Sequence, residues 1–316
     1  MNVGAQEMPA VSVVIPSRNR PVPLTKAVSS ALNQTFHDIE VIVILDGPDE
    51  QSVAALKAVN DERLRVVSLS ELVGGAEARN VGIRQARGAW IALLDDDDEW
   101  MPEKLAEQMQ MALAANGPCL VVTRYIDRGR RADIVHPKTA PTPGQHISDY
   151  LFCGVSWLGF RGGFLQTSTW LAPRSAFLSM PFTKGLTRNQ DTDWLLRAVP
   201  ALHMQVLVVW NVLSIFHNVA DPGRVTAKSD WRYSINWAVS MREYFTPRAF
   251  SFFVATVTIY AAKLQSEPFS AAMEQFKIAK KLGALDLKIL WLFFATWFIF
   301  PYGRFGMRSR LHHLFR

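Results

Sequence analysis

The chain has 316 residues, of which 49% are hydrophobic and 20% are charged. This composition supports one large domain or two ordinary ones, and it excludes disordered, collagen-like and highly charged low-complexity chains. The formal net charge of +6 indicates an anionic partner and leaves nucleic acid, anionic lipid and a phosphorylated substrate open. Two cysteines, Cys119 and Cys153, are too few for a disulfide scaffold and lack metal-site spacing, so a reducing compartment is expected.

The beginning of the chain has no signal-peptide pattern. It has no basic region, and the apolar run Val11–Ile15 is far shorter than the apolar part of a signal peptide, so export is not expected.

Strand-like and helix-like segments then alternate along the first hundred residues. Strands are expected at Val11–Ile15, Glu40–Leu45, Leu64–Leu69 and Trp90–Leu94, and helices at Val22–Leu32, Gln51–Val59 and Ala76–Ala86. This βαβ series predicts an α/β fold with a mainly parallel sheet covered on both faces. Ligands of such sheets bind beyond the carboxyl ends of the strands, where Pro16, Asp46 and Asp95–Asp98 fall.

The pattern loosens after a predicted helix at Pro102–Ala115, and residues 129–163 are expected to form an extended loop region. The first domain is completed by a strand near Phe164–Leu171, a helix near Asp191–Arg197 and a strand at Gln205–Val209. Beyond Asn218 tryptophan and phenylalanine become frequent, and acidic residues stop after Asp286. The boundary is therefore predicted between residues 9–218 and a mostly helical region, 219–316.

Four consecutive aspartates, Asp95–Asp98, follow a buried apolar strand. Carboxylates this close repel one another unless a cation compensates or their pKa values rise. Mg²⁺ or Mn²⁺ takes oxygen ligands and shares them with substrate phosphates, so one or two side chains suffice to hold it. The alternative is a solvated acidic turn at the start of the helix near Pro102, where negative charge is favourable.

Three sequence motifs are distinctive when they are taken together. They are VSVVIPSRNRP from Val11, AEARNVGIRQARG from Ala76 and LLDDDDEWMPEKL from Leu93. Over roughly Pro9–Asn218 the chain resembles the inverting glycosyltransferases of family 2, which have the GT-A fold.

The resemblance implies donor-site roles for several of these residues. Asp97 would bind the metal, Mn²⁺ or Mg²⁺, while Asp95 would face the nucleotide ribose with Asp96 beside it in the donor site. Pro16 and Asp46 would line the base and ribose pocket, and Arg79 would lie near the nucleotide. The family often has two aspartates where this chain has only Asp46 before Gly47, and an ordinary Asp-Gly turn is the alternative there.

The segment Arg188–Arg197 resembles the family's Glu-Asp-x-Asp segment, with Gln190 in place of the glutamate. Asp191 matches the catalytic base, because an inverting transfer needs a carboxylate within reach of the acceptor hydroxyl. The alternative is that Asp191 and Asp193 only favour a helix N-terminus electrostatically.

Further candidates lie around this segment. His217 matches a histidine that completes the metal site in many GT-A enzymes, although a structural histidine is the alternative. Arg224 and Lys228 could clamp the leaving diphosphate, or could be solvated loop charges. Gly163 would allow the backbone to approach the donor sugar, and Trp157 and Trp170 could stack on sugars; core or turn roles are the alternatives.

The last hundred residues combine aromatic and basic side chains. Ile289–Gly303 has 15 residues without a charge, which is short for a membrane span, and basic residues precede and follow it. This composition predicts an interfacial helix on an anionic membrane surface, with a helical hairpin buried against the first domain or a partner subunit as the alternative. An oligomer therefore stays open, and nucleic acid is not expected because no base-reading module is present.

Two classes of function follow. One is a metal-dependent, inverting glycosyltransferase at the cytoplasmic membrane face, moving a sugar from a nucleotide-sugar donor, expected to be a UDP-sugar, to a lipid-linked or polysaccharide acceptor. The other is a non-catalytic nucleotide-binding relative that serves as a membrane-docked assembly subunit. The presence of both Asp97 and Asp191 favours the enzyme.

Overall fold

The computed structural model describes residues 8–128, 133–156, 159–160, 163–217 and 230–299, with the side chains of residues 155–160 left undescribed. These residues form two compact units. The first consists of Met1–Gly129, Asp133–His136 and Leu165–Asn218, and the second of Arg130–Ala132, Pro137–Phe164 and Val219–Arg316. The division near residue 218 lies where the composition changes, whereas residues 137–164, expected in the first domain, belong to the second unit.

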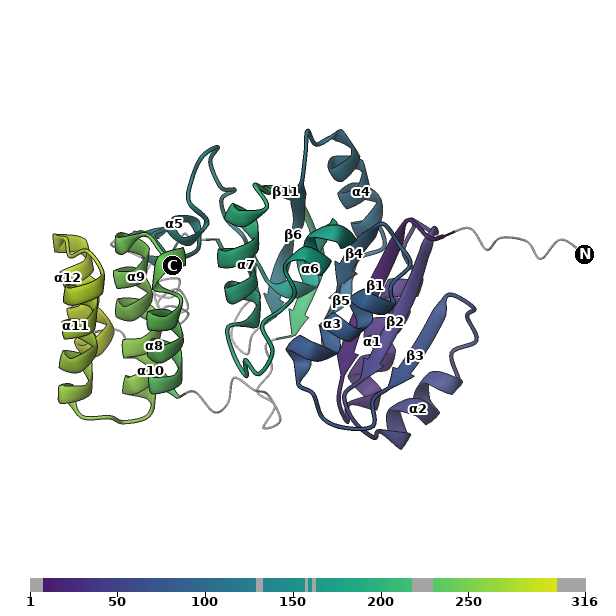
Figure 1. The fold of residues 1–316 in the computed structure, drawn as a ribbon, viewed down its shortest axis with the longest axis horizontal. Coiled ribbons are helices and arrows are strands. Elements are labelled where there is room, and N and C mark those ends of the chain that lie inside the picture. The colour runs from purple at the N-terminus through teal and green to yellow at the C-terminus, as the bar shows by residue number, and fades with distance from the viewer. Residues whose placement is uncertain (1–7, 129–132, 157–158, 161–162, 218–229, 300–316) are drawn as a thin grey trace, which may run out of the picture. The chain divides into compact units, whose positions relative to one another are not determined.

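A large mixed sheet forms the centre of the first unit (Figure 1). Its strands run in the order β3-β2-β1-β4-β10-β6-β11-β5, with β7 paired to β6. The strands are β1 (Val11–Ser17), β2 (Ile39–Leu45), β3 (Leu64–Ser68), β4 (Trp90–Leu93), β5 (Glu99–Trp100), β6 (Cys119–Arg128), β7 (Asp133–His136), β10 (Trp170–Pro173) and β11 (Gln205–His217). The pairs among β1 to β4 are parallel, while β10 is antiparallel to both β4 and β6.

Helices cover both faces of this sheet. Alternate residues of β1 point to opposite sides: Val13 packs in the core beneath α1 and α4, while Val14 meets α3 at Gly82. Gly82 is needed there because a Cβ would come within 2.4 Å of the Val14 side chain. The helices of this unit are α1 (Pro21–Leu32), α2 (Glu50–Lys57), α3 (Gly75–Gln85), α4 (Lys104–Ala114), α6 (Arg174–Ser179) and α7 (Gln190–Ala201).

The predicted α/β fold is confirmed, with local differences. The strand expected near Phe164–Leu171 begins only at Trp170, because the 3₁₀ turn η1 (Thr167–Thr169) precedes it. The long strand β6 was not predicted, and β11 continues well past Val209. Residues 129–163 were expected to be loop but contain β7, α5 (Ile147–Phe152) and the short pair β8 (Val155–Ser156) and β9 (Gly159–Phe160).

The second unit is mostly helical, as expected. Aromatic rings hold α5 to the segment formed by residues 245–253. Phe152 of α5 stacks on Phe245 with 5.5 Å between ring centroids, and it meets Phe253 edge-on at 5.2 Å. Its other elements are α8 (Trp231–Ser240), η3 (Arg242–Tyr244), α9 (Pro247–Phe253), η4 (Val254–Thr258), α10 (Ile259–Leu264), α11 (Phe269–Leu282), α12 (Leu287–Phe294) and η5 (Ala295–Ile299). Among the described residues no helix is both long and apolar enough to cross a membrane.

A buried lysine in the first unit leads to a prediction about stability. The Lys104 amino group is wholly buried, 3.8 Å from the centroid of the Trp100 ring and 2.6 Å from Gln108 Oε1. Because burial disfavours the charged form, the pKa of Lys104 falls well below its ordinary 10.5.

The free energy of unfolding should therefore rise with pH between this depressed pKa and 10.5, because the unfolded chain binds the proton that the folded chain has released. The slope contributed by Lys104 is at most about 1.4 kcal/mol per pH unit. Urea unfolding of Lys104→Met across this range should lack that slope. The control Lys57→Met, at an exposed position of α2, should keep it; equal slopes in both variants would contradict the prediction.

Candidate active site

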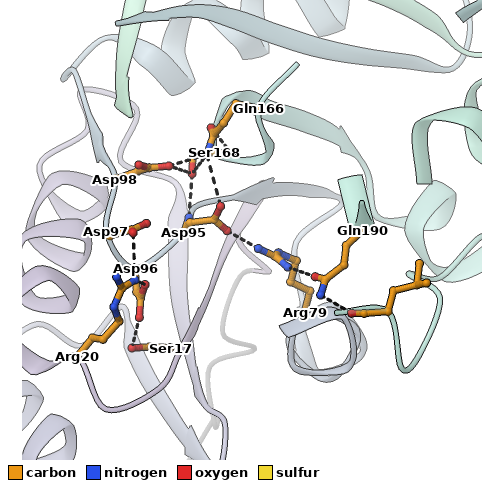
Figure 2. Close-up of polar contacts among 11 residues, drawn as sticks. Ser17, Arg20, Arg79, Asp95, Asp96, Asp97, Asp98, Gln166, Ser168 and Gln190 are labelled. Carbon is orange, nitrogen blue, oxygen red and sulfur yellow. Dashed lines mark hydrogen bonds and ion pairs between the residues drawn. The ribbon is translucent and has the colours of Figure 1, made fainter. Parts of the chain in front are cut away.

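The four aspartates lie where β4 ends and each carboxylate has different neighbours (Figure 2). The main chain turns tightly here, with Asp98 N donating to Asp95 O at 3.2 Å before β5 begins. The repulsion expected from four adjacent carboxylates is thus met by protein groups on several other segments.

Asp98 is the most buried of the four and is held by the turn before β10. Ser168 Oγ and Gln166 Nε2 each donate to Asp98 Oδ2 at 2.6 Å. Burial and the nearby carboxylates of Asp95 and Asp97 raise the pKa of Asp98 well above its usual range, while the Ser168 hydrogen bond opposes this shift. Ser168 Oγ also accepts from Asp95 N at 2.9 Å, so one hydroxyl fixes both ends of the cluster.

Asp96 and Asp97 face the loop after β1. Ser17 Oγ donates to Asp96 Oδ2 at 2.6 Å, and Arg20 Nη1 lies 3.0 Å from both Asp96 Oδ1 and Asp97 Oδ2. Burial raises the pKa of Asp96, and its contacts with Ser17 and Arg20 act in the opposite direction. Asp97 keeps 18% of its side chain exposed, more than Asp96, and so presents the more accessible oxygen atoms.

Asp46 at the end of β2 shapes the loop that leads into α3. Its Oδ1 accepts from Val73 N at 2.7 Å and its Oδ2 from Gly74 N at 3.0 Å. Both oxygen atoms therefore take part in holding a loop that is distant in the chain, and not only a local Asp-Gly turn. Pro16 lies at the partly exposed end of β1, next to β2, and the nucleotide contacts of Pro16 and Asp46 stay predictions.

Arg79 of α3 bridges two parts of the site. One Nη donates to Asp95 Oδ1, and the other donates to Gln190 Oε1 at 2.8 Å, at the beginning of α7 (Figure 2). Arg79 thus connects the aspartate cluster to the helix that carries Asp191.

Asp191 lies in the first turn of α7 and is partly exposed. Its Oδ1 accepts from Thr192 N at 2.7 Å, and its Oδ2 has no hydrogen-bond partner among the residues that the structure describes. Burial raises the pKa of Asp191; the charge of Arg79 lowers it, and that of Asp95 adds to the rise. A carboxylate with a free oxygen and a raised pKa is suited to accept a proton.

His217 ends β11 beside the cluster, and its main-chain N lies 3.3 Å from Asp98 Oδ1. Its ring, however, contacts Glu99 Oε1 at 2.8 Å, so the expected histidine ligand of a metal is here paired with a neighbouring carboxylate. Within the described residues no three His, Cys, Asp or Glu side chains are grouped so that they could hold a metal ion. The carboxylate oxygens of the cluster nevertheless suit Mg²⁺ or Mn²⁺, which readily take their remaining ligands from water and phosphate.

The remaining candidates lie elsewhere. Gly163 belongs to the second unit, where a Cβ would overlap the Tyr150 ring at 1.9 Å, so close packing already requires glycine there. Of the two roles open for Trp170, the structure supports the core role and not sugar stacking: Trp170 is fully buried and packs on Trp194 with 5.3 Å between ring centroids. Arg224, Lys228 and Trp157 lie outside the described residues.

Sequence reasoning missed four residues that hold the cluster. Ser17 and Arg20 stand within the quoted VSVVIPSRNRP motif, so a signal for them was present. Gln166 and Ser168 had no such signal, because they are about seventy residues away and reach the cluster only through the pairing of β10 with β4.

A mixed sheet of this order, with a carboxylate cluster after its central parallel strand and a further carboxylate at the start of a later helix, is the GT-A architecture of glycosyltransferases. Residues 12–177, more than half of the chain, match the family model described as Glycosyl transferase family 2. The chain belongs to this family, and it is a glycosyltransferase and not the non-catalytic subunit considered above.

Curated relatives agree with this assignment. The chain is 27% identical over 248 residues to the amylovoran biosynthesis glycosyltransferase AmsB of Erwinia amylovora, covering 75% of this chain and 79% of that protein. It is 33% identical over 106 residues to WfgD of Escherichia coli, named UDP-Glc:alpha-D-GlcNAc-diphosphoundecaprenol beta-1,3-glucosyltransferase. That second alignment covers 34% of this chain and 42% of the relative.

Solved structures share the fold at low sequence identity. S. aureus TarS in complex with UDP-GlcNAc has a TM-score of 0.58 at 15% identity, covering 90% of this chain and 79% of that one. The mannosyltransferase PcManGT from Pyrobaculum calidifontis, in complex with GDP-Man and Mn²⁺, has a TM-score of 0.56 at 15% identity, covering 98% and 84%. At this identity the similarity concerns the fold alone.

Proposed function

We propose that the chain is a metal-dependent, inverting glycosyltransferase that moves a sugar from a UDP-sugar to a lipid-linked or polysaccharide acceptor. The observation that carries this proposal is the Asp95–Arg79–Gln190 bridge, which brings the carboxylate cluster and the first turn of α7 into one site. The UDP-sugar donor is supported by the similarity to TarS, whose structure is known in complex with UDP-GlcNAc, and the lipid-linked acceptor by the similarity to WfgD, a diphosphoundecaprenol glucosyltransferase by name. The complex of PcManGT with Mn²⁺ supports a divalent cation.

Asp97 would hold the metal, with Asp95 and Asp96 in the donor site, and the ion would supply charge to stabilise the departing diphosphate. Asp191 would take the proton from the acceptor hydroxyl. The acceptor oxygen then forms its bond to the anomeric carbon as the bond from that carbon to the diphosphate oxygen breaks, and the electron pair leaves with the nucleoside diphosphate. Attack opposite the leaving group inverts the configuration.

We place this reaction at the cytoplasmic membrane face, with the α12–η5 helix as the attaching surface. Leu287, Leu290, Phe294 and Phe298 follow one another at helical spacing and are each more than two-fifths exposed. On α11 the side chains of Lys277, Lys280 and Lys281 are exposed as well. Exposed apolar side chains on one helix, together with exposed lysines on another, match an anionic lipid surface, where each basic residue contributes on the order of 1 kcal/mol.

The metal role makes the first functional prediction. Asp97→Ala should abolish transfer and lower Mn²⁺-dependent affinity for UDP by at least about tenfold, because the ion loses its protein ligand. Calorimetry with UDP, with Mn²⁺ and with EDTA, measures this, and EDTA should reproduce the loss in the wild type. Asp38→Ala, at an exposed position before β2, is the control. Undiminished UDP affinity of Asp97→Ala in Mn²⁺ would refute the assignment.

The proposed role of Asp191 as the catalytic base leads to the second functional prediction. Asp191→Asn keeps the shape of the side chain but removes the proton acceptor, so turnover should fall by roughly 10² to 10⁴ while donor binding is retained. The matched control is Asp193→Asn in the same turn, because Asp193 is bonded to Thr183 and Arg197 and should affect stability more than turnover. Near wild-type turnover of Asp191→Asn would assign the proton transfer to another group.

The proposed membrane-binding surface of the protein leads to the third functional prediction. Replacing Leu290, Phe294 and Phe298 together by serine should abolish flotation with vesicles that contain anionic lipid, since these side chains are exposed and their loss spares the core. The control replaces the exposed Val22 and Leu113 of the first unit by serine. Full-length protein that stays in solution with such vesicles at both low and high salt would contradict the membrane proposal.

A further inference from the structure

The Arg79 side chain is mostly buried and is held by other side chains of the protein. Its side chain is only 12% exposed, and its two terminal nitrogens donate to Asp95 and to Gln190. The remaining nitrogen, Nε, is buried without a partner among the described residues, and the guanidinium carbon lies 5.8 Å from the centroid of the Phe182 ring. A planar guanidinium holds two acceptors in a fixed geometry that a lysine cannot reproduce.

Gln190 is fixed at both ends of its amide. Its Oε1 accepts from Arg79 at 2.8 Å, and its Nε2 donates to Leu186 O at 2.7 Å (Figure 2). A glutamate here could accept from Arg79 but could not donate to the Leu186 carbonyl. A glutamate would also compete with Asp95 for the charge of Arg79, whereas the neutral amide leaves that charge to Asp95.

The backbone beside Gln190 is constrained as well. Asn189 has a φ of 59°, in the left-handed region, and α7 begins directly after it. Two residues on from Asn189, Asp191 depends on this turn for its position. A contact that anchors Gln190 therefore also orients the proposed base.

We infer that Arg79 is a positioning residue that joins Asp95 in the donor site to Gln190 in the first turn of α7, so that one guanidinium orients both the donor carboxylate and Asp191. This assigns Arg79 a role different from the nucleotide contact that the family resemblance implied. The inference rests on the proposed role of Asp191 as the base.

The position of Arg79 also affects the pKa of Asp191 through its charge. The charges acting on Asp191 are the guanidinium of Arg79 from α3 and the carboxylate of Asp95 after β4, and the cation opposes the rise of the Asp191 pKa. The ionised form of a base is the active one, so turnover is lost as pH falls through this pKa. Removing the cation moves that loss to higher pH, while exchanging it for another cation does not.

The test uses the full chain with Mn²⁺ and compares Arg79→Lys, Arg79→Met and Gln190→Met with the control Arg84→Met, an exposed arginine of the same helix. Gln190→Met should lower kcat about tenfold with the affinity for UDP, measured by calorimetry, changed less than about twofold. Arg79→Lys should lose kcat similarly and keep the acid limb of the pH profile. Arg79→Met should shift that limb to higher pH.

The double variant Arg79→Lys/Gln190→Met should lose no more kcat than the worse single variant, because both remove one connection. Wild-type kcat in Gln190→Met, or losses that multiply in the double variant, would overturn the inference. Failure of the base assignment is recognised separately, because Asp191→Asn would then keep its turnover. In that case the non-additive effect of the Arg79 and Gln190 substitutions on the melting temperature still tests the connection itself.

Discussion

Electrostatic repulsion among Asp95, Asp96, Asp97 and Asp98 is the constraint on which the first unit depends. Four carboxylates directly follow the C-terminal end of β4, and this arrangement is stable only if other segments supply hydrogen-bond donors and cations. The structure meets this need from three directions. The groups are Ser17 at the end of β1 and Arg20 after it, Gln166 and Ser168 before β10, and Arg79 on α3. The carboxylates that bind substrate in the proposed function thereby also hold these segments together.

This arrangement separates the roles of the four side chains. Asp98 is enclosed by Ser168 and Gln166 and serves the architecture, while Asp97 keeps accessible oxygen atoms and contacts the partly exposed Arg20. Asp95 has a third role, because its partner Arg79 also donates to Gln190 at the start of α7. A single acidic run thus contains a buried anchor, a candidate metal ligand and a link to the candidate base.

The second unit adds a surface of another kind. Its core includes aromatic rings of α5, α8 and α9 and the ring of Phe245, such as Phe152 against Phe253. Its α12–η5 helix leaves Leu290, Phe294 and Phe298 exposed. Ile289, Leu292 and Phe293 of the same helix are buried, so this segment serves both the core and the outer face. In the proposed function the chemistry belongs to the first unit and attachment to the second.

The amino-acid sequence by itself determined the alternation of strands and helices through β4, the donor-site motifs and the family, because these depend on local apolar periodicity and on residues adjacent in the chain. Only the tertiary structure decided that Trp170 belongs to the core, that Asp46 binds the loop before α3, and that Ser168 holds Asp95 and Asp98. It also decided that Arg79 reaches Gln190. The physical reason is that these contacts join segments about 30 to 110 residues apart in the chain, and β10 enters the sheet antiparallel between β4 and β6, a pairing that no local pattern specifies.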